Sequence, residues 1–127
     1  MLTFFPADNL VISVLSGAIT VRSFLDATVE LNTHPEHLDG MKELWDLRTA
    51  SLESLTGNDI MLATNSLRQF GTSTSRTTAF VVSNDLNYGM ISMWNAYADI
   101  VLPKDRRIFR DYEEARVWIL GSTSGTK

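Results

Sequence analysis

Two groups of polar residues, each directly after an apolar run, carry side chains suited to binding an anion. The apolar runs cover residues 41–47 and 77–82 and have the composition of buried strands. In an open sheet of parallel strands, ligands bind at the carboxyl ends of the strands, where helix N-termini also present free N–H donors. The candidate ligand- or anion-binding residues are therefore Arg48, Thr49, Ser51, Ser83, Asn84 and Asp85.

The same residues also have purely structural interpretations. Serine, asparagine and aspartate are common helix N-caps, so residues 83–85 could do no more than start a helix. The Arg48 guanidinium suits a phosphate or carboxylate ligand, but it can equally pair with Asp46, Glu53 or Asp85. Capping and ion pairing are the commoner uses of such residues. The sequence leaves both the structural role and the ligand-binding role open.

Both histidines lie in one short segment that also holds two carboxylates, His34-Pro-Glu-His37-Leu-Asp39. Imidazole and carboxylate are ligands for zinc and other divalent ions. The segment contains a proline and is not helical, so the spacing does not aim its ligands at one point. We therefore predict a solvated loop and no metal site, with His34 and His37 as the weak ligand candidates.

The only local cluster of basic residues is Lys104, Arg106, Arg107 and Arg110. On a strand, Arg106 and Arg107 point to opposite faces. The cluster is suited to contact an acidic partner or anionic lipid headgroups, or to protect a short sheet edge from aggregation, and we favour the protective role. No aromatic residues interleave with it as a nucleic-acid platform would require.

The segment after Asp85 repeats apolar residues at helical spacing. Its stripe of Leu86, Met90, Met93, Trp94 and Tyr97 is typical of a core-facing helix surface. Methionines and aromatic residues beyond the needs of a core can form a dimer face or the lid of an apolar pocket. The candidates for such a surface are Tyr88, Met90, Ile91, Met93 and Trp94.

Motifs for catalysis are missing from the sequence. No phosphate-binding glycine loop and no dinucleotide-binding fingerprint are present, and the chain has no cysteine. The segment Gly121-Ser-Thr-Ser-Gly125 resembles a nucleophile elbow only superficially, because its central residue is Thr123. We therefore expect no catalytic residues, no cofactor and no enzymatic activity.

The elements that must position these residues alternate along the chain. The predicted strands cover residues 2–5, 10–15, 41–47, 77–82 and 106–109, and the predicted helices start near Thr20, Thr56, Asn84 and Asp111. The first two strands form a hairpin and are antiparallel, whereas the helical crossovers make the other strands parallel. The sequence thus predicts an α/β fold with a mixed, mostly parallel five-stranded sheet and four helices in the order β-β-α-β-α-β-α-β-α.

Composition supports one ordinary globular domain. The chain has 127 residues, of which 44% are hydrophobic and 20% charged, and the formal net charge is -4. We predict one domain over residues 1–120 and a disordered tail over 121–127, with a flexible connection at residues 71–75. The acidic balance argues against a nucleic-acid partner, and the absence of a signal-peptide pattern predicts a cytoplasmic protein.

Three segments resemble the SpoIIAA-like family of small bacterial proteins, within the wider group of STAS domains. They are Leu44-Trp45-Asp46-Leu47-Arg48, Ala79-Phe80-Val81-Val82 followed by Ser83-Asn84-Asp85, and Ile108-Phe109-Arg110-Asp111 followed by Glu114-Ala115-Arg116-Val117-Trp118-Ile119. The resemblance covers nearly the whole chain and concerns structural positions. It implies a STAS/SpoIIAA-like fold for residues 1–120.

The resemblance also implies two modes of function. STAS antagonists switch partners by phosphorylation of a serine after the third strand, which makes Ser51 and Ser54 the phosphoacceptor candidates, although the family's Ser-Gly context is absent. Lipid-carrying relatives imply a hydrophobic ligand or a membrane surface. We expect a non-enzymatic domain that binds a hydrophobic or lipid-like ligand in a pocket between the sheet and the second and third helices, or associates peripherally with a membrane. The alternatives are a regulatory protein-interaction module, which could be a homodimer, and a small enzyme acting at the strand ends.

Overall fold

A computed structural model describes residues 1–66 and 77–121, and its elements follow the predicted order. The strands are β1 (Leu2–Phe5), β2 (Leu10–Ala18), β3 (Lys42–Ser51), β4 (Thr77–Val81) and β5 (Asp105–Phe109). The helices are α1 (Val21–Thr33), α2 (Gly57–Asn65), α3 (Asp85–Val101) and α4 (Tyr112–Gly121), and a 3-10 turn, η1 (Pro6–Asp8), joins the first two strands.

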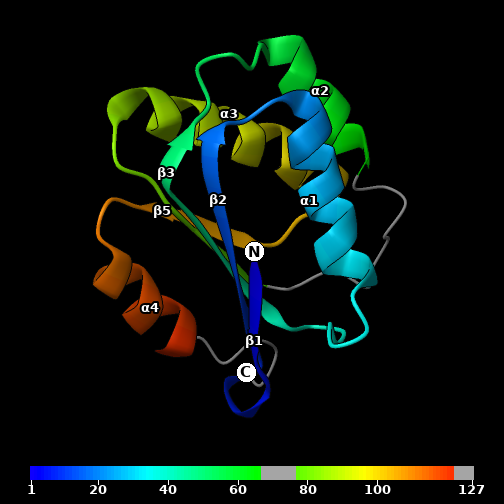
Figure 1. Ribbon diagram of the computed structural model, residues 1–127, viewed down its shortest axis with the longest axis vertical. Coiled ribbons are helices and arrows are strands. Elements are labelled where there is room, and N and C mark those ends of the chain that lie inside the picture. Colours follow the sequence, from blue (N-terminus) through cyan, green and yellow to red (C-terminus); the bar gives the residue numbers. More distant parts are fainter. Residues whose placement is uncertain (67–76, 122–127) are drawn as a thin grey trace.

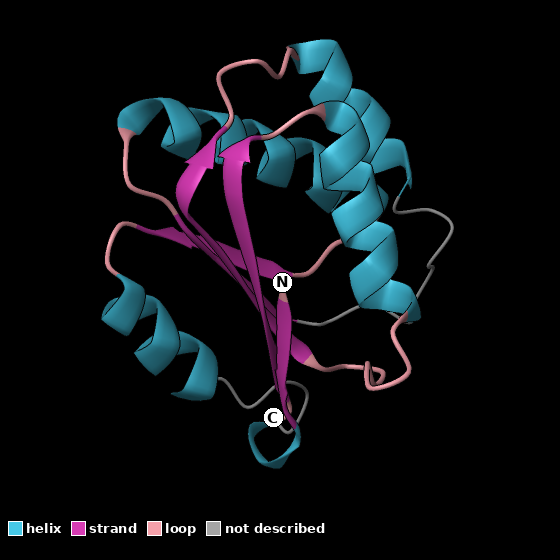
Figure 2. Cartoon of the chain, viewed as in Figure 1, coloured by secondary structure: helices cyan, strands magenta, loops and turns pink. Residues whose placement is uncertain are grey.

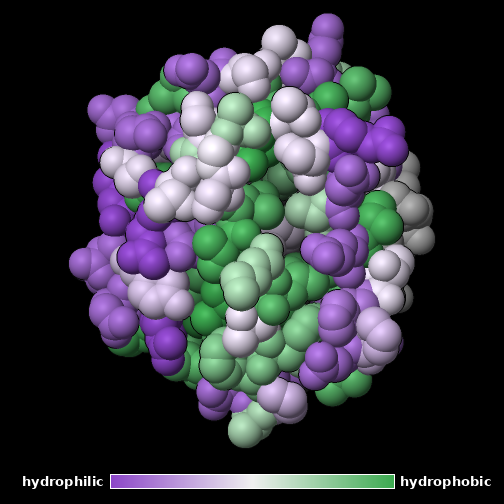
Figure 3. All heavy atoms as spheres, viewed as in Figure 1, coloured by the Kyte–Doolittle hydropathy of each residue, from purple (hydrophilic) through white to green (hydrophobic). Residues whose placement is uncertain are grey.

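The sheet has the strand order β1-β2-β3-β4-β5, so each strand lies beside its neighbour in the chain. The β1 strand is antiparallel to β2, and the remaining pairs are parallel, which confirms the predicted mixed sheet. The α1, α2 and α3 helices pack on one face and α4 packs on the other (Figures 1 and 2). Figure 3 shows apolar residues gathered where Figure 1 draws the β1 edge of this sheet.

Polar caps set the starts of the helices. The Thr20 hydroxyl accepts a hydrogen bond from the Ser23 N–H, and the Thr56 hydroxyl accepts one from the Asp59 N–H, each in a reciprocal capping box. At α3 the cap is Asn84, whose side chain accepts from the Asn87 N–H at 2.8 Å. These caps confirm the predicted starts of the first three helices.

Two strands extend further than the sequence suggested. The predicted ends at Leu15 and Leu47 are wrong, because β2 and β3 keep pairing through Ala18 and Ser51 after an irregularity beyond Val14. At Gly17 the backbone has a φ of 75°, in the left-handed region that glycine adopts without a steric cost. Because of this extension, Arg48, Thr49 and Ser51 belong to a strand and not to a loop.

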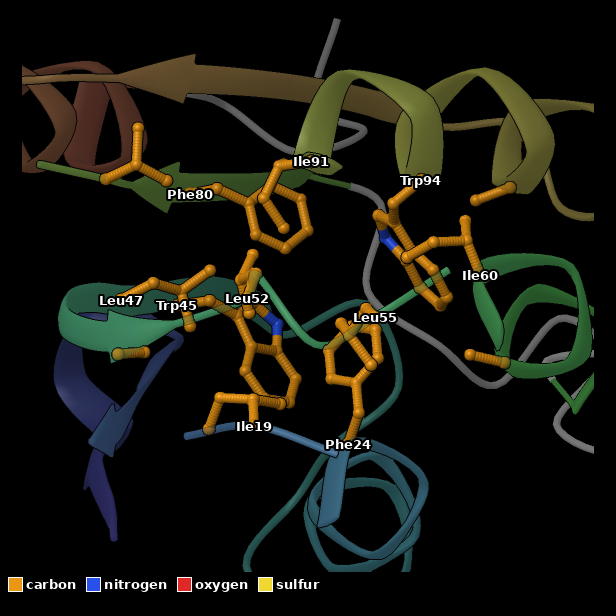
Figure 4. Packing of buried hydrophobic residues seen from close by; sticks show 14 of the residues in the cluster. Ile19, Phe24, Trp45, Leu47, Leu52, Leu55, Ile60, Phe80, Ile91 and Trp94 are labelled. Carbon is orange, nitrogen blue, oxygen red and sulfur yellow. The ribbon is translucent and has the colours of Figure 1, made fainter. Parts of the chain in front are cut away.

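Aromatic residues dominate the core between the sheet and α1–α3. The Phe24 ring of α1 lies 4.9 Å from the Trp94 ring of α3 and 6.4 Å from the Trp45 ring of β3, both in edge-to-face arrangement. Figure 4 shows these three side chains reaching into one layer from the helices and the sheet. A smaller cluster, which includes Leu44 and Ile119, fills the space between the sheet and α4.

The buried face of α3 differs from the predicted stripe. The residues that point into the core are Asn87, Ile91, Trp94 and Ala98, whereas Leu86 and Met93 of the predicted stripe are exposed. The cause is Asn87, whose side chain accepts from the Leu52 N–H and donates to the Ala50 carbonyl. These two bonds tie the start of α3 to the end of β3 and rotate a polar residue inward.

Three sequence predictions fall wholly or partly outside the described ranges. Residues 71–75, predicted as a flexible connection, lie outside them, and so does the end of the second predicted helix beyond residue 66. The predicted tail begins inside α4, which includes Gly121, and residues 122–127 are not described.

Candidate functional site

At the carboxyl edge of the sheet, Arg48 is held by residues of its own chain. Its guanidinium donates to both carboxylate oxygens of Asp46, at 2.9 and 2.8 Å, and lies over the Tyr112 ring of α4 at 4.3 Å. Hydrogen bonding to Arg48 lowers the pKa of Asp46, and the same bonds raise the pKa of Arg48. Of the partners that the sequence left open, Asp46 is the one that the structure shows.

The other residues predicted at this edge also have partners. The Ser83 hydroxyl donates to the Arg48 carbonyl, and the Thr49 hydroxyl lies 2.8 Å from that of Ser16. The Asp85 carboxylate pairs with Arg110 at 2.7 Å, and the same guanidinium lies over the Tyr88 ring. This edge is thus a set of exposed, paired groups.

The phosphoacceptor candidates lie near this edge. The Ser51 carbonyl accepts a hydrogen bond from the Ile19 N–H, and the Ser54 hydroxyl donates to the Ile19 carbonyl at 3.0 Å. The Ser54 side chain is exposed before the start of α2, and Ser51 ends β3 half-buried.

A row of buried polar residues crosses the opposite end of the sheet. Glu43 of β3 is paired in register with Thr78 of β4, and Thr78 is paired with Arg106 of β5. Two residues further along each strand, on the same face of the sheet, a second row is apolar and consists of Trp45, Phe80 and Ile108. Neighbouring strands are about 4.8 Å apart, so the three polar side chains stand side by side.

This buried polar row lines a partly enclosed cavity between the sheet, α1 and α3. The aromatic part of its wall is Phe24, Trp45, Phe80 and Trp94. The polar part is Thr28, Asn32, Glu43, Thr78, Lys104 and Arg106. The space open to the centre of a water molecule is about 30 Å³. The lining residues place this cavity between the sheet, α1 and α3. The pocket expected from the sequence was between the sheet and the second and third helices.

Four of the residues that line this cavity have a buried polar atom without a hydrogen-bond partner. The atoms are Asn32 Oδ1, Glu43 Oε2, Thr78 Oγ1 and Arg106 Nη1. The Glu43 residue is 4% exposed, and its other carboxylate oxygen accepts from the Trp45 indole N–H at 3.2 Å. Arg106 donates from Nη2 to the Leu102 carbonyl, whereas its Nη1 lies 3.6 Å from Asp99, beyond hydrogen-bond distance.

Burial and charge act together on the ionisable groups of the cavity. Burial alone would raise the pKa of Glu43, but the Lys104 ammonium and the groups of His37 and Trp45 lower it below its usual value. Burial lowers the pKa of Lys104, against the attraction of Glu43, and it lowers the pKa of Arg106, against the attraction of Asp99 and Glu43. Glu43 is therefore ionised at neutral pH, beside the half-buried Lys104 and the buried Arg106 side chain.

The two histidines have different surroundings. The buried imidazole of His37 has its Nε2 3.7 Å from Glu43 Oε2, an ion-pair distance that is too long for a hydrogen bond. The His34 ring packs on Phe4 at 4.5 Å, and its Nδ1 accepts from the Glu36 N–H. Within residues 1–66 and 77–121, no three His, Asp or Glu side chains are grouped so that they could hold a metal ion.

An open groove adjoins the cavity. Its volume is about 380 Å³, and it is lined by Asn95, Ala96, Asp99 and Asp105 together with Lys104 and Arg106. The last two side chains line both spaces. Lys104 and Arg106 therefore stand between the cavity and the surface.

The apolar surface candidates divide between core and surface. Ile91 and Trp94 are buried, and Trp94 lines the cavity, whereas Met90 is half-buried. Tyr88 and Met93 are each 37% exposed. The Met93 sulfur lies near Gly57, which places this part of α3 beside the start of α2.

Sequence reasoning missed the buried polar row because it looked only at the carboxyl ends of the strands. A signal was available in the strands themselves. Glu43 precedes Trp45 by two residues, and Thr78 precedes Phe80 by two, so each pair shares one face of a strand predicted to be buried. Arg106 was assigned to an exposed edge, but it points toward α1 and α3 with only 4% of its side chain exposed.

The geometry defines a class of protein, an α/β domain whose mixed sheet has three helices on one face and one on the other. Comparisons with protein-family models and with curated proteins find no match. A comparison with solved structures finds a protein of unknown function from Shewanella loihica PV-4, of the DUF3478 family, described as having a SpoIIAA-like fold. The two chains share 16% identity with a TM-score of 0.52, over 87% of this chain and 83% of that one. The fold of this chain is thus SpoIIAA-like, as its sequence predicts.

Proposed function

We propose that this SpoIIAA-like domain is a non-catalytic binding module, and that its ligand is a small molecule held in the cavity between the sheet, α1 and α3. The observation that carries the proposal is the set of four unpartnered polar atoms around this cavity. A buried polar atom without a partner costs about 1–3 kcal/mol, and more where it is charged. A ligand that supplies the missing partners would recover that free energy on binding.

The size of the cavity favours a small ligand over a lipid. Pockets that hold drug-sized molecules measure roughly 300–1,000 Å³, whereas the space for water centres here is about 30 Å³. The polar residues at the wall favour a polar ligand as well. The hydrophobic or lipid-like ligand expected from the sequence would need a larger and more apolar space than this one. No helix within residues 1–66 and 77–121 is long and apolar enough to span a bilayer.

Tryptophan fluorescence tests the proposal directly. Trp45 and Trp94 line the cavity, whereas Trp118 belongs to α4 on the other face of the sheet and packs on Phe109. We expect polar metabolite-sized compounds to change the emission of the wild type and of Trp118→Phe, and not that of the double variant Trp45→Phe/Trp94→Phe. Native mass spectrometry should show the same compounds bound with one-to-one stoichiometry. A panel that leaves both the emission and the apo mass unchanged would overturn the proposal.

A second candidate function is supported by the exposed apolar side chains of α2 and α3. Leu86 and Met93 share one face of α3, and Met61 and Leu62 are exposed on α2. Exposed apolar residues grouped on adjacent helices are typical of protein-interaction surfaces. We propose a second copy of the chain as the partner, as in the predicted homodimer. Light scattering after size exclusion should then give a dimer mass for the wild type and a monomer mass for Met93→Glu; a wild-type monomer at high concentration excludes this candidate.

A further inference from the structure

We propose that the free edge of β1 pairs with the same edge of a second copy of the chain, so that the two sheets join into one continuous sheet. This interface is independent of the cavity and goes beyond the function proposed for it. It also differs from the exposed apolar residues of α2 and α3, which are the other surface that a second copy could contact.

The free edge of β1 presents the backbone groups of Leu2 and Phe4. In an antiparallel pair of strands, residues that exchange both backbone hydrogen bonds alternate with residues that exchange none. Met1 and Val14 exchange both bonds, at 3.0 and 2.9 Å, so Thr3 is the next residue whose backbone bonds to β2. The N–H and C=O groups of Leu2 and Phe4 therefore point away from β2, toward the free edge.

The two edges of the sheet differ in their protection against pairing with another strand. Natural proteins protect edge strands with charged side chains, prolines or bulges. The β5 edge follows this rule, because it carries Asp105, Arg106 and Arg107. The four residues of β1 are Leu-Thr-Phe-Phe, without a charge or a proline, and their register with β2 is regular. The β1 edge is thus able to accept a further strand, whereas the β5 edge is protected from one.

Apolar side chains lie beside the β1 edge on both faces of the sheet. Leu2 and Phe4 are half-buried and pack against the core on the side of α1. Phe5 and Val14 are on the opposite face, and each is 37% exposed. Figure 3 shows apolar residues gathered where Figure 1 draws this edge. An added strand would remove part of this apolar surface from water, which favours association.

The residues of β1 are complementary to a second copy of β1. If two such strands pair antiparallel about a two-fold axis at Thr3, Leu2 of each copy lies opposite Phe4 of the other. The free backbone groups of these residues then bond to one another, so the groups of both edges are satisfied. The two Thr3 side chains lie opposite each other, and threonine pairs are favourable across antiparallel strands. Residues 2–5 carry no charged side chain, so no like charges meet at the axis.

Charge variants at the two-fold axis test the interface by light scattering after size exclusion, at increasing protein concentration. Thr3 is exposed in the single chain, so its variants should fold as the wild type does, which circular dichroism checks. We expect a dimer mass for the wild type and a monomer mass for Thr3→Lys and for Thr3→Glu, because like charges then meet at the axis. Mixing these two variants should restore the dimer mass, since opposite charges then meet. The matched control, Thr49→Lys, adds the same charge to an exposed threonine of the central strand β3 and should leave the dimer unchanged.

A disulfide tests the register directly. The chain has no cysteine, so Thr3→Cys introduces a single thiol. Opposite residues that exchange no backbone bonds have Cα atoms about 4.5 Å apart in an antiparallel pair, within the range that a disulfide spans. We expect Thr3→Cys to form a covalent dimer with oxidised glutathione, whereas Thr49→Cys should stay monomeric.

Several results would overturn the β1 interface. A wild type that stays monomeric at every concentration would do so, and so would a dimer that persists in Thr3→Lys. A dimer that Met93→Glu dissociates and Thr3→Lys does not would assign the contact to α2 and α3. Equal crosslinking of Thr3→Cys and Thr49→Cys would exclude the two-fold register. None of these measurements involves a ligand, so the fluorescence and native mass experiments decide the proposed function separately.

Discussion

Charged residues are paired at one end of the parallel strands and lack full pairing at the other end. At the carboxyl edge, Asp46 and Arg48 form a bidentate pair, with 47% of the arginine side chain exposed and a tyrosine ring beneath it. At the opposite end, Glu43 and Arg106 are buried, do not pair with each other, and keep polar atoms without partners. The ion pair of the carboxyl edge thus keeps its arginine half in solvent, whereas the opposite end keeps polar atoms without partners in the core.

This contrast indicates which end carries a function. Solvent-exposed ion pairs contribute little to stability and need no ligand to explain them. Buried polar atoms without partners are rare in native proteins, because each one raises the free energy of the folded state. A protein that keeps four of them around one cavity is less stable empty than it would be with an apolar core, which is typical of a binding site.

Removing the buried carboxylate should produce the largest effect on stability. In Glu43→Ala, the cations Lys104 and Arg106 lose their buried anion, and we expect the free energy of unfolding to fall by about 3–5 kcal/mol. Asp46→Ala should cost only about 1–2 kcal/mol, because water can solvate the exposed Arg48 once its partner is gone. Urea denaturation of both variants measures the difference. Equal losses would show that the two ends are energetically alike.

The sequence predicted the fold well because its signals were local. Thr20, Thr56 and Asn84 are caps that act within one helical turn, and the hydrophobic runs identify the strands without knowledge of their partners. The face of α3 was predicted less well, since Asn87 is buried only because the Ala50 carbonyl and Leu52 N–H, more than thirty residues away, accept and donate to it. Such a contact leaves no periodic signal.

The sequence places Glu43 and Thr78 on buried strand faces, but it does not show that they line one cavity with Arg106. Glu43, Thr78 and Arg106 come from three strands, and only the register between the strands brings them into one row. Each residue alone reads as an ordinary polar position in a strand. The paired residues of the carboxyl edge were easier to anticipate, since Asp46 and Arg48 are two residues apart and share one face of the same strand.

Acid should weaken both ends of the sheet, and salt should separate their contributions. The pKa values of Glu43 and Asp46 are lowered from 4.5 and 3.8, so each carboxylate stabilises the folded state above those values and loses its contribution as the pH falls through the lower folded pKa. The free energy of unfolding should therefore fall below pH 4.5, with a smaller slope in Glu43→Gln and in Asp46→Asn.

Salt at about 0.5 M should reduce the contribution of Asp46 to the free energy of unfolding, because the side chain of its partner Arg48 is 47% exposed. It should leave the contribution of Glu43, because charges that are buried on all sides are screened less. The measurement is urea denaturation of the wild type and both variants at several pH values, with and without salt. Salt could instead remove the contribution of Glu43 to the free energy of unfolding as fully as that of Asp46. Solvent would then reach the cavity, and the two ends of the sheet would not differ in their screening by salt.

Arg48→Lys tests how much the carboxyl edge depends on geometry and not on charge alone. Lysine keeps the charge, but it loses the bidentate contact with Asp46 and the planar contact with the Tyr112 ring. We expect a loss of about 0.5–1 kcal/mol in the free energy of unfolding. The control is Arg22→Lys, an exposed pair with Asp26 on α1, which should change nothing measurable. A loss in Arg48→Lys no larger than in the control would mean that the edge holds its ions by charge alone.

The smallest effect should have the opposite sign and should come from the middle of the buried polar row. Thr78→Val replaces an unpartnered buried hydroxyl with a methyl group of the same shape, so the empty protein should gain about 0.5–1 kcal/mol. Thr28→Val, at another position on the cavity wall, removes a hydroxyl that donates to the Phe24 carbonyl at 3.0 Å, and should show no such gain. Thermal unfolding of both variants measures this difference in stability relative to the wild type. A loss in Thr78→Val would show that water already satisfies this hydroxyl, and the polar row would then be as fully partnered as the carboxyl edge.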